Sequence, residues 1–277
     1  MKYKPSFFKT GHRGCRGLFP ENTINGFIES LKLGVNAIEL DIVVSKDSKL
    51  VVSHEPYMNH EICLLPSGNK IQKSEELNYN LFQMTYHEIK TFDCGSKPHP
   101  RFPQQHHEPA YKPLLSEVIE AIEDYCTKNN LPPILYDIEL KSEKEVYNSF
   151  QPEPAVFAEM VAQFIQSSSI SNRTIIRSFD PNPLKYLHQH FPILPLAYIV
   201  ENNLSVEENL NELGFVPFMY SPDYRLVSKS DMQFLKEKNC LVVPWTVNTL
   251  DEMNNLIQLG VDGIITDYPN LFKSLSN

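Results

Sequence analysis

Cysteine is scarce in this sequence, and the spacing of the cysteines argues against two features that stabilise small proteins, a network of disulfides and a zinc site. Five cysteines stand among 277 residues, at positions 15, 63, 94, 126 and 240, and no two form a Cys-x-x-Cys pair. Few, odd in number and widely spaced, they indicate neither a disulfide framework nor a zinc site. Cys63 and Cys94 lie in one irregular stretch, however, and a single bridge between them stays open.

Long apolar runs and an excess of positive charge are missing too. No apolar run reaches 18 residues, so we expect no integral membrane segment. The net charge of −9 argues against a partner such as nucleic acid or an anionic membrane, although it is compatible with a local basic pocket. The opening residues, MKYKPSFFKTG, lack the apolar core of a signal peptide, which favours a cytoplasmic protein. A sequence trimmed at its start would instead allow a periplasmic or secreted one. Nothing indicates an oligomeric state.

What the sequence has is a regular alternation of strand and helix patterns. Strands are expected at 6–14, 36–45, 49–55, 133–142, 173–179, 194–200, 215–221, 241–247 and 263–267. Helices are expected at 21–34, 114–130, 153–167, 182–190, 206–213, 228–238 and 249–259, and a short helix at the end. Such alternation is typical of parallel βαβ units. With the 49–55 strand counted as an excursion, eight units remain, which predicts an α/β fold of the TIM (β/α)8 barrel type as a single domain over 1–277. A doubly wound open sheet is the alternative.

Residues 56–112 break this rhythm. The stretch contains clusters of Pro, His and Gln and has weak periodicity. It is interpreted as a long insertion into the barrel, following the second strand region. A segment of this length without clear elements is usually either a functional lid or disordered.

Carboxylates gather on two of the expected strands. Glu39 and Asp41 are two residues apart in the apolar stretch AIELDIVV, so both side chains point to the same side of the strand. Glu139 and Lys141 share one face of YDIELKS in the same way. Buried carboxylates repel one another unless a cation lies between them, and oxygen ligands suit Mg²⁺ or Ca²⁺. A solvent-facing or salt-bridged strand end is the structural alternative.

The stretch TGHRGCRGLFPENT, residues 10–23, puts a histidine and an arginine side by side at the end of the first strand. Arg13 suggests an anion to bind and His12 a proton to move. His54 ends the 49–55 strand in the same way. A lone histidine is more often structural, but carboxyl ends of barrel strands are where such enzymes place their chemistry. Arg16 is expected at the surface, and Asn22 is expected to cap the helix that follows.

The motifs GHRG and PENT, IELDIVVSKDSKLVVSHE, IELK, WTVN and DGIITDYP, in this order, resemble the glycerophosphodiester phosphodiesterase family over nearly the whole chain. The resemblance implies a TIM barrel with an insertion after the strand that bears the second histidine, which matches 56–112. It implies Glu39, Asp41 and Glu139 as ligands of a divalent metal ion, Ca²⁺ or Mg²⁺. His12 and His54 would be the general base and general acid, in an order that the match does not fix.

The resemblance also implies contacts to the substrate. Arg13 and Lys141 would bind the phosphate. Phe179, in RSFD, and Trp245, in WTVN, match aromatic positions near the glycerol pocket, although either could simply fill the barrel interior. The family usually has His-Asp where this chain has His54-Glu55, which keeps the carboxylate but lengthens its reach.

The implied reaction is the metal-dependent hydrolysis of small glycerophosphodiesters, such as glycerophosphocholine or glycerophosphoethanolamine, to glycerol 3-phosphate and an alcohol. The glycerol 2-hydroxyl is the expected nucleophile, which would give a cyclic phosphate that water then opens; direct attack by water is the alternative. Two other functions remain as rivals: a phospholipase-like phosphodiesterase acting on lysolipid headgroups, and a protein that binds phosphodiesters without cleaving them.

Overall fold

Eight parallel strands form a closed barrel in the computed structural model, which describes residues 4–275. The strands are β1 (Phe8–Gly11), β2 (Ala37–Val44), β4 (Leu135–Leu140), β5 (Thr174–Ser178), β6 (Leu196–Val200), β7 (Met219–Pro222), β8 (Leu241–Val242) and β9 (Gly263–Thr266). Their order in the sheet is β8-β7-β6-β5-β4-β2-β1-β9. Main-chain hydrogen bonds between the β8 segment and β9 close the ring: Ile265 N donates to Pro244 O at 3.0 Å, and Val247 N donates to Ile265 O at 2.9 Å. The predicted TIM barrel is therefore confirmed.

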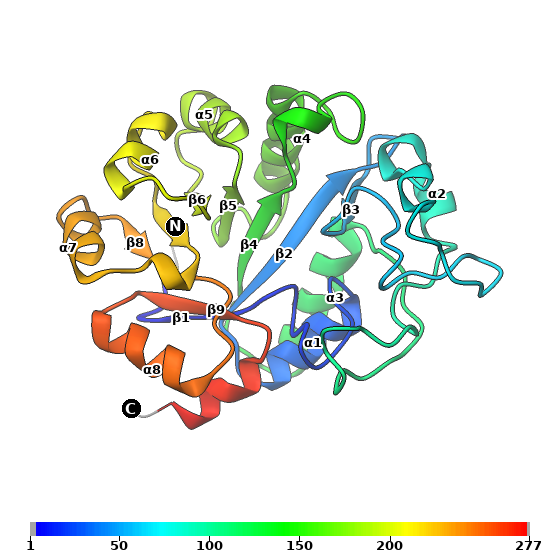
Figure 1. Ribbon diagram of the computed structural model, residues 1–277, viewed down its shortest axis with the longest axis horizontal. Helices are drawn as coiled ribbons and strands as arrows, with labels where there is room; N and C mark the ends of the chain where they lie inside the picture. Colours follow the sequence, from blue (N-terminus) through cyan, green and yellow to red (C-terminus); the bar gives the residue numbers. More distant parts are fainter. Residues whose placement is uncertain (1–3, 276–277) are drawn as a thin grey trace.

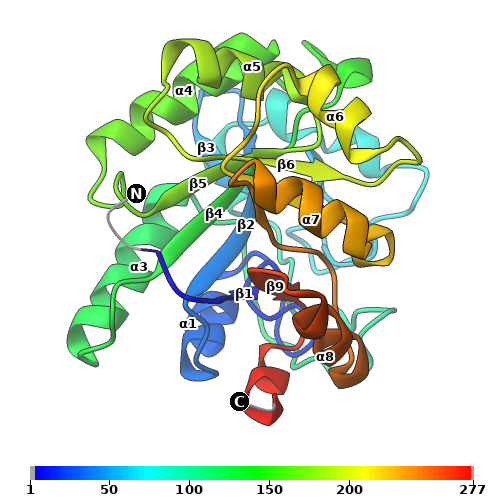
Figure 2. The same cartoon turned by 90° about the vertical axis from the view of Figure 1, so that its left-hand side faces the viewer.

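Helices surround this barrel, as Figure 1 shows from the carboxyl ends of the strands and Figure 2 from the side. They are α1 (Ile24–Lys32), α3 (Leu115–Lys128), α4 (Pro154–Ser167), α5 (Pro181–His190), α6 (Val206–Leu213), α7 (Lys229–Glu237) and α8 (Leu250–Leu259). None of the helices within residues 4–275 combines the length and the apolar character that crossing a bilayer requires. The expected cap of α1 is wrong by one position. Thr23 accepts the hydrogen bond from Gly26 N, because Asn22 adopts a left-handed backbone with φ of 55° and turns its side chain toward Asp41.

The interior of the barrel has an apolar lower part and a polar upper part. Near the amino ends of the strands, inward side chains pack together, among them Phe8, Ala37, Leu135, Ile175 and Ile265. Because side chains alternate along a strand, the residue two positions closer to the carboxyl end also points into the barrel. On β2 and β4 these positions are polar, and the register pairs Glu39 with Asp137 and Asp41 with Glu139.

The predicted 241–247 strand is shorter in the structure, where β8 ends at Val242. Pro244 has no N–H group to donate to a neighbouring strand, so the regular ladder cannot continue through it. The chain still runs along the barrel, since Trp245 N donates to Pro222 O at 3.1 Å. Strand β7 likewise begins at Met219 rather than at 215, just after Pro217.

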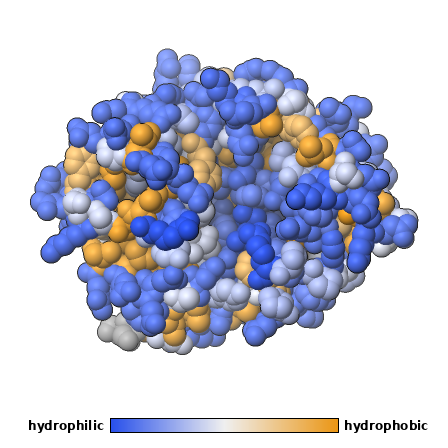
Figure 3. All heavy atoms as spheres, viewed as in Figure 1, coloured by the Kyte–Doolittle hydropathy of each residue, from blue (hydrophilic) through white to orange (hydrophobic). Residues whose placement is uncertain are grey.

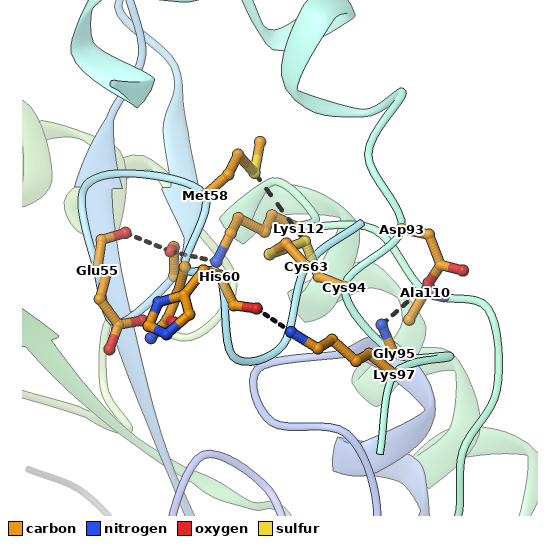
Figure 4. The surroundings of a disulfide bond; sticks show 12 residues. Glu55, Met58, His60, Cys63, Asp93, Cys94, Gly95, Lys97, Ala110 and Lys112 are labelled. Atoms are coloured by element: carbon orange, nitrogen blue, oxygen red, sulfur yellow. Dashed lines mark hydrogen bonds between the residues drawn. A yellow bond between two sulfur atoms is a disulfide. The ribbon is translucent and has the colours of Figure 1, made fainter. Parts of the chain in front are cut away.

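The 56–112 stretch is ordered and packs around a small hydrophobic core, to which Val43 and Val51 of the preceding strands also contribute. After the short strand β3 (Leu50–Val52), which runs antiparallel to β2, it forms 3₁₀ turns and the helix α2 (Tyr86–Ile89). Its core includes Met58, Ile71, Leu81 and Ile89, together with a disulfide between Cys63 and Cys94 (Figure 4). Local turns and this bridge hold the segment together, which explains why its sequence shows little periodicity.

Candidate functional site

A cavity of about 500 Å³ opens at the carboxyl ends of the strands. In Figure 3, which has the same viewpoint as Figure 1, it corresponds to the polar hollow near the centre of the face. Every residue proposed from the sequence for catalysis, metal binding or substrate contact, except Asp41, lines it: His12, Arg13, Glu39, His54, Glu139, Lys141, Phe179 and Trp245. Asp41 is buried directly beside them, next to Glu139 in the strand register.

Glu39, Asp41 and Glu139 form a buried acidic cluster. One carboxylate oxygen from each lies within 4.8 Å of the other two. Burial raises the pKa of Glu39, and the nearby Asp41 charge raises it further; burial also raises the pKa of Glu139. The Oδ1 atom of Asp41 is buried and has no hydrogen-bond partner within residues 4–275. Three crowded carboxylates with one unsatisfied oxygen fit a hard divalent cation.

Two cationic side chains partly balance this cluster. Arg13 donates from Nη1 to Glu21 Oε1 at 2.8 Å, and its Nε lies 3.3 Å from Asp41 Oδ2. Lys141 donates to Glu139 Oε1 at 2.6 Å. Burial alone would raise the pKa of Asp41, but the Arg13 charge outweighs this effect and holds that pKa far below its usual range. Both cations therefore lie at the cavity wall, where an anionic ligand would meet them.

His12 is held by a carboxylate from the far end of the chain. Its Nδ1 lies 2.6 Å from Asp267 Oδ1, while its Nε2 is 3.9 Å from Glu39 Oε2. An ionised carboxylate only accepts hydrogen bonds, so Nδ1 carries a proton and Nε2 is the free nitrogen of the neutral ring. Burial, reinforced by the charge of Arg16, lowers the pKa of His12 to about 4 despite Asp267.

His54 has a corresponding arrangement. Its Nδ1 lies 2.8 Å from Oε1 of the adjacent Glu55, so its Nε2 is again the nitrogen left free by this contact. Burial and the charge of Arg13 lower the pKa of His54 well below its ordinary value. The two histidines thus follow different strands, β1 and β3, and line one cavity. In each of them the Nδ1 atom contacts a carboxylate.

Asp267 and Arg16 were not found from the sequence. Arg16 is 6% exposed and not at the surface as expected; it donates from Nε and Nη2 to the two oxygens of Asp267 at 3.0 and 3.2 Å. Asn248 donates to Asp267 Oδ2 at 2.8 Å. The signal was available for Asp267, because it directly follows β9, and β9 pairs with the strand that precedes His12.

Arg177 is a further cavity residue that sequence reasoning missed. It is 2% exposed and donates to Asp137 Oδ2 at 2.7 Å and to Ser221 Oγ at 2.8 Å. Its strand position lies beside Glu139 in the register. A buried cation at this level lowers the repulsion among the carboxylates of the cluster.

Phe179 and Trp245 face each other across one side of the cavity. Their ring centroids are 5.4 Å apart at an interplanar angle of 88°, an edge-to-face contact. Trp245 is anchored, since its Nε1 donates to Ser221 O at 2.9 Å. Phe179 remains 37% exposed, so its ring presents apolar surface to whatever occupies the cavity.

Comparison with known proteins agrees with this geometry. A sequence model of the glycerophosphoryl diester phosphodiesterase family matches residues 12–271. A glycerophosphodiester phosphodiesterase of Bacillus subtilis is 27% identical over 95% of this chain and 84% of its own length. Another, from Caldanaerobacter subterraneus, is 29% identical over 95% of both. The crystal structure of a putative glycerophosphoryl diester phosphodiesterase from Silicibacter pomeroyi is 26% identical, with a TM-score of 0.84 over 99% of this chain and 96% of that one.

Proposed function

Since this chain belongs to the glycerophosphoryl diester phosphodiesterase family and is a glycerophosphodiester phosphodiesterase, we propose that it releases glycerol 3-phosphate and an alcohol from small substrates such as glycerophosphocholine and glycerophosphoethanolamine. The observation that carries the proposal is the meeting of His12 and His54 in one cavity, next to the three-carboxylate cluster and to Arg13 and Lys141. Each histidine is held by a carboxylate at Nδ1, which supports a proton-transfer role for Nε2 of both.

Glu39, Asp41 and Glu139 would hold the divalent cation, Ca²⁺ or Mg²⁺. When bound, such an ion supplies positive charge against the negative charge that develops on the phosphate oxygens during cleavage. The unsatisfied Oδ1 of Asp41 and the raised pKa values of Glu39 and Glu139 support this assignment, because a cation would relieve both.

Arg13 and Lys141 would bind the phosphate oxygens. Both already lie at the cavity wall beside the acidic cluster, so a phosphate there would find two donors without a large rearrangement of the main chain. Arg13 can offer its planar guanidinium to two oxygens, while Lys141 acts as a point charge. Phe179, whose ring centroid is 5.7 Å from Lys141 Nζ, and Trp245 would pack against the carbon atoms of the glycerol.

One histidine would accept a proton from the attacking hydroxyl, and the other would donate a proton to the leaving alkoxide. Each transfer of this kind contributes about 10²–10⁴-fold to a rate. We propose the glycerol 2-hydroxyl as the attacking group, with a cyclic phosphate as the first product and water opening it afterwards. A 2-deoxy substrate should then bind without turnover; cleavage of that analogue at the normal rate would instead favour direct attack by water.

The test is the release of glycerol 3-phosphate from glycerophosphocholine and glycerophosphoethanolamine by the purified protein. It is run with Ca²⁺, with Mg²⁺ and with EDTA, beside His12→Ala and His54→Ala variants. Release that needs a divalent ion and is lost in both variants is the expected result. Should no small diester be cleaved with either ion, lysophospholipids become the next substrates to examine. If binding is retained with no cleavage of any of them, the protein binds phosphodiesters without hydrolysing them.

A further inference from the structure

Lys112 is a buried charged residue that lies outside the proposed catalytic set. It stands at the end of the 56–112 insertion, just before α3, and is 5% exposed. Removing an ammonium group from water is unfavourable unless charge or hydrogen bonding compensates for it. Burial lowers the pKa of Lys112, while the charges of Glu55, Glu21 and Asp41 oppose this effect. A lysine kept in such a place indicates a specific role for its head group.

That head group is joined to the turn that carries His54. Lys112 Nζ donates to Ser53 Oγ at 2.7 Å, and Ser53 Oγ donates to the main-chain oxygen of Glu55 at 2.6 Å. Figure 4 shows Lys112 reaching toward Glu55. Ser53 is fully buried, and its N–H donates to Asp41 O at 3.0 Å. The 53–55 turn is therefore fixed to β2 on one side and to the end of the insertion on the other.

The position of the His54 ring depends on this turn at two points. The backbone of His54 lies between Ser53 and Glu55, and the Nδ1 atom of its ring is 2.8 Å from the Glu55 carboxylate. Glu55 replaces the aspartate expected from the family resemblance, and its side chain has one more rotatable bond. A longer side chain is harder to hold in one geometry, so the main chain beneath it needs firmer support.

We propose that Lys112 is a positioning residue for His54, which it holds through Ser53 and the main chain of Glu55. The inference rests on the proposed function, in which His54 transfers a proton. It also links the insertion to the catalytic centre, because Lys112 is the insertion's last residue and the 53–55 turn is where the insertion begins.

Lys112→Met tests this, since methionine fills similar space without the charge or the donor. We expect kcat to fall about 10-fold or more with KM nearly unchanged, because a displaced histidine affects the transition state more than substrate binding. The melting temperature should not fall, since methionine fills the space of the lysine without the cost of keeping an ammonium group out of water. Lys73→Met, an exposed lysine of the same insertion, is the matched control and should leave both quantities unchanged.

Two further measurements separate positioning from a general structural role. Ser53→Ala should reproduce the loss in kcat, and the double variant with Lys112→Met should lose little more, because both act through one chain of hydrogen bonds. In protein labelled with ¹⁵N-histidine, Lys112→Met should shift the ring signals of His54 and leave those of His12 in place. An unchanged kcat, or a loss with unmoved His54 signals and a lower melting temperature, overturns the proposal.

His54→Ala distinguishes a failure of the positioning role of Lys112 from a failure of the proposed function. If this variant is inactive while Lys112→Met is fully active, the positioning role is wrong and the proposed function stands. If His54→Ala retains full activity, the proposed role of His54 fails first, and Lys112 then has no catalytic group to position.

Discussion

His12 and Asp267 are 255 residues apart in the chain, and their side chains lie 2.6 Å apart. The contact exists because β1 and β9, the first and last strands of the chain, pair side by side in the barrel. Asp267 is itself held by Arg16 and Asn248, so it cannot easily turn away from the imidazole. The pairing of the first and last strands therefore determines which nitrogen of His12 faces the cavity.

Replacing this carboxylate should reduce the rate of catalysis without unfolding the protein. In Asp267→Asn, the new amide can donate to Nδ1, which favours the ring tautomer with the proton on Nε2. We expect kcat to fall by about 10²–10⁴-fold, in line with other histidines that lose a carboxylate partner. Steady-state kinetics measure the effect, and Asp251→Asn on the exposed start of α8 is the matched control. A kcat within twofold of the unaltered protein contradicts the prediction.

Stability should decrease as the pH falls through the range in which His12 titrates. Burial lowers the pKa of this imidazole to about 4 in the folded protein, against 6.5 for an ordinary histidine. The unfolded chain therefore binds the proton first, and protonation favours unfolding between about pH 6.5 and 4. Thermal melts in EDTA from pH 7 to 4 should show a steeper loss for the unaltered protein than for His12→Gln. Parallel curves would mean that His12 does not contribute.

Arg101 should influence which alcohol leaves. It is an exposed residue of the insertion that lines the cavity, and no carboxylate pairs with it among the residues described. Its charge disfavours a cationic headgroup and favours an anionic one. Arg101→Gln should raise kcat/KM for glycerophosphocholine relative to glycerophosphoserine by about two- to fivefold, the range expected for an exposed charge. The comparison needs only the two substrates assayed in parallel, and an unaltered ratio speaks against this role.

The disulfide should stabilise the insertion. Cys63 and Cys94 are 31 residues apart, and closing a loop of that length restricts the unfolded chain by roughly 3–4 kcal/mol. Cys63→Ser with Cys94→Ser, or reduction by dithiothreitol, should lower the melting temperature or increase proteolysis between 56 and 112. Buried Cys15 provides the control, since Cys15→Ala removes a thiol but no bridge. Equal proteolysis of oxidised and reduced protein would show that the small core suffices.

The sequence predicted the barrel well because the strands and helices repeat with local periodicities that single segments reveal. Side-chain alternation placed Glu39 and Asp41 on one face of a strand, and the family resemblance added Glu139; the three carboxylates do meet in the structure. Asp267 was missed because no local pattern links it to His12; only its position after the last strand, which pairs with the first, indicates the contact. The burial of Arg16 was not predicted, because it depends on the contact with Asp267.

The insertion was the least predictable part for a different reason. Its order comes from turns, a few apolar side chains and one covalent bridge, none of which produces a period of two or 3.6 residues. The role of Lys112 could not be predicted for the same reason, because its partner Ser53 is 59 residues earlier in the chain.

The two ends of the insertion leave and rejoin the barrel side by side, where Val52 N donates to Pro113 O at 2.8 Å. A segment whose ends are this close can be lengthened, shortened or exchanged without stretching the strands that hold it. The barrel can therefore keep its structure while the insertion is replaced by another segment. Any graft designed at this junction should keep Ser53 and Lys112, because their hydrogen bond joins the end of the insertion to the turn that carries His54.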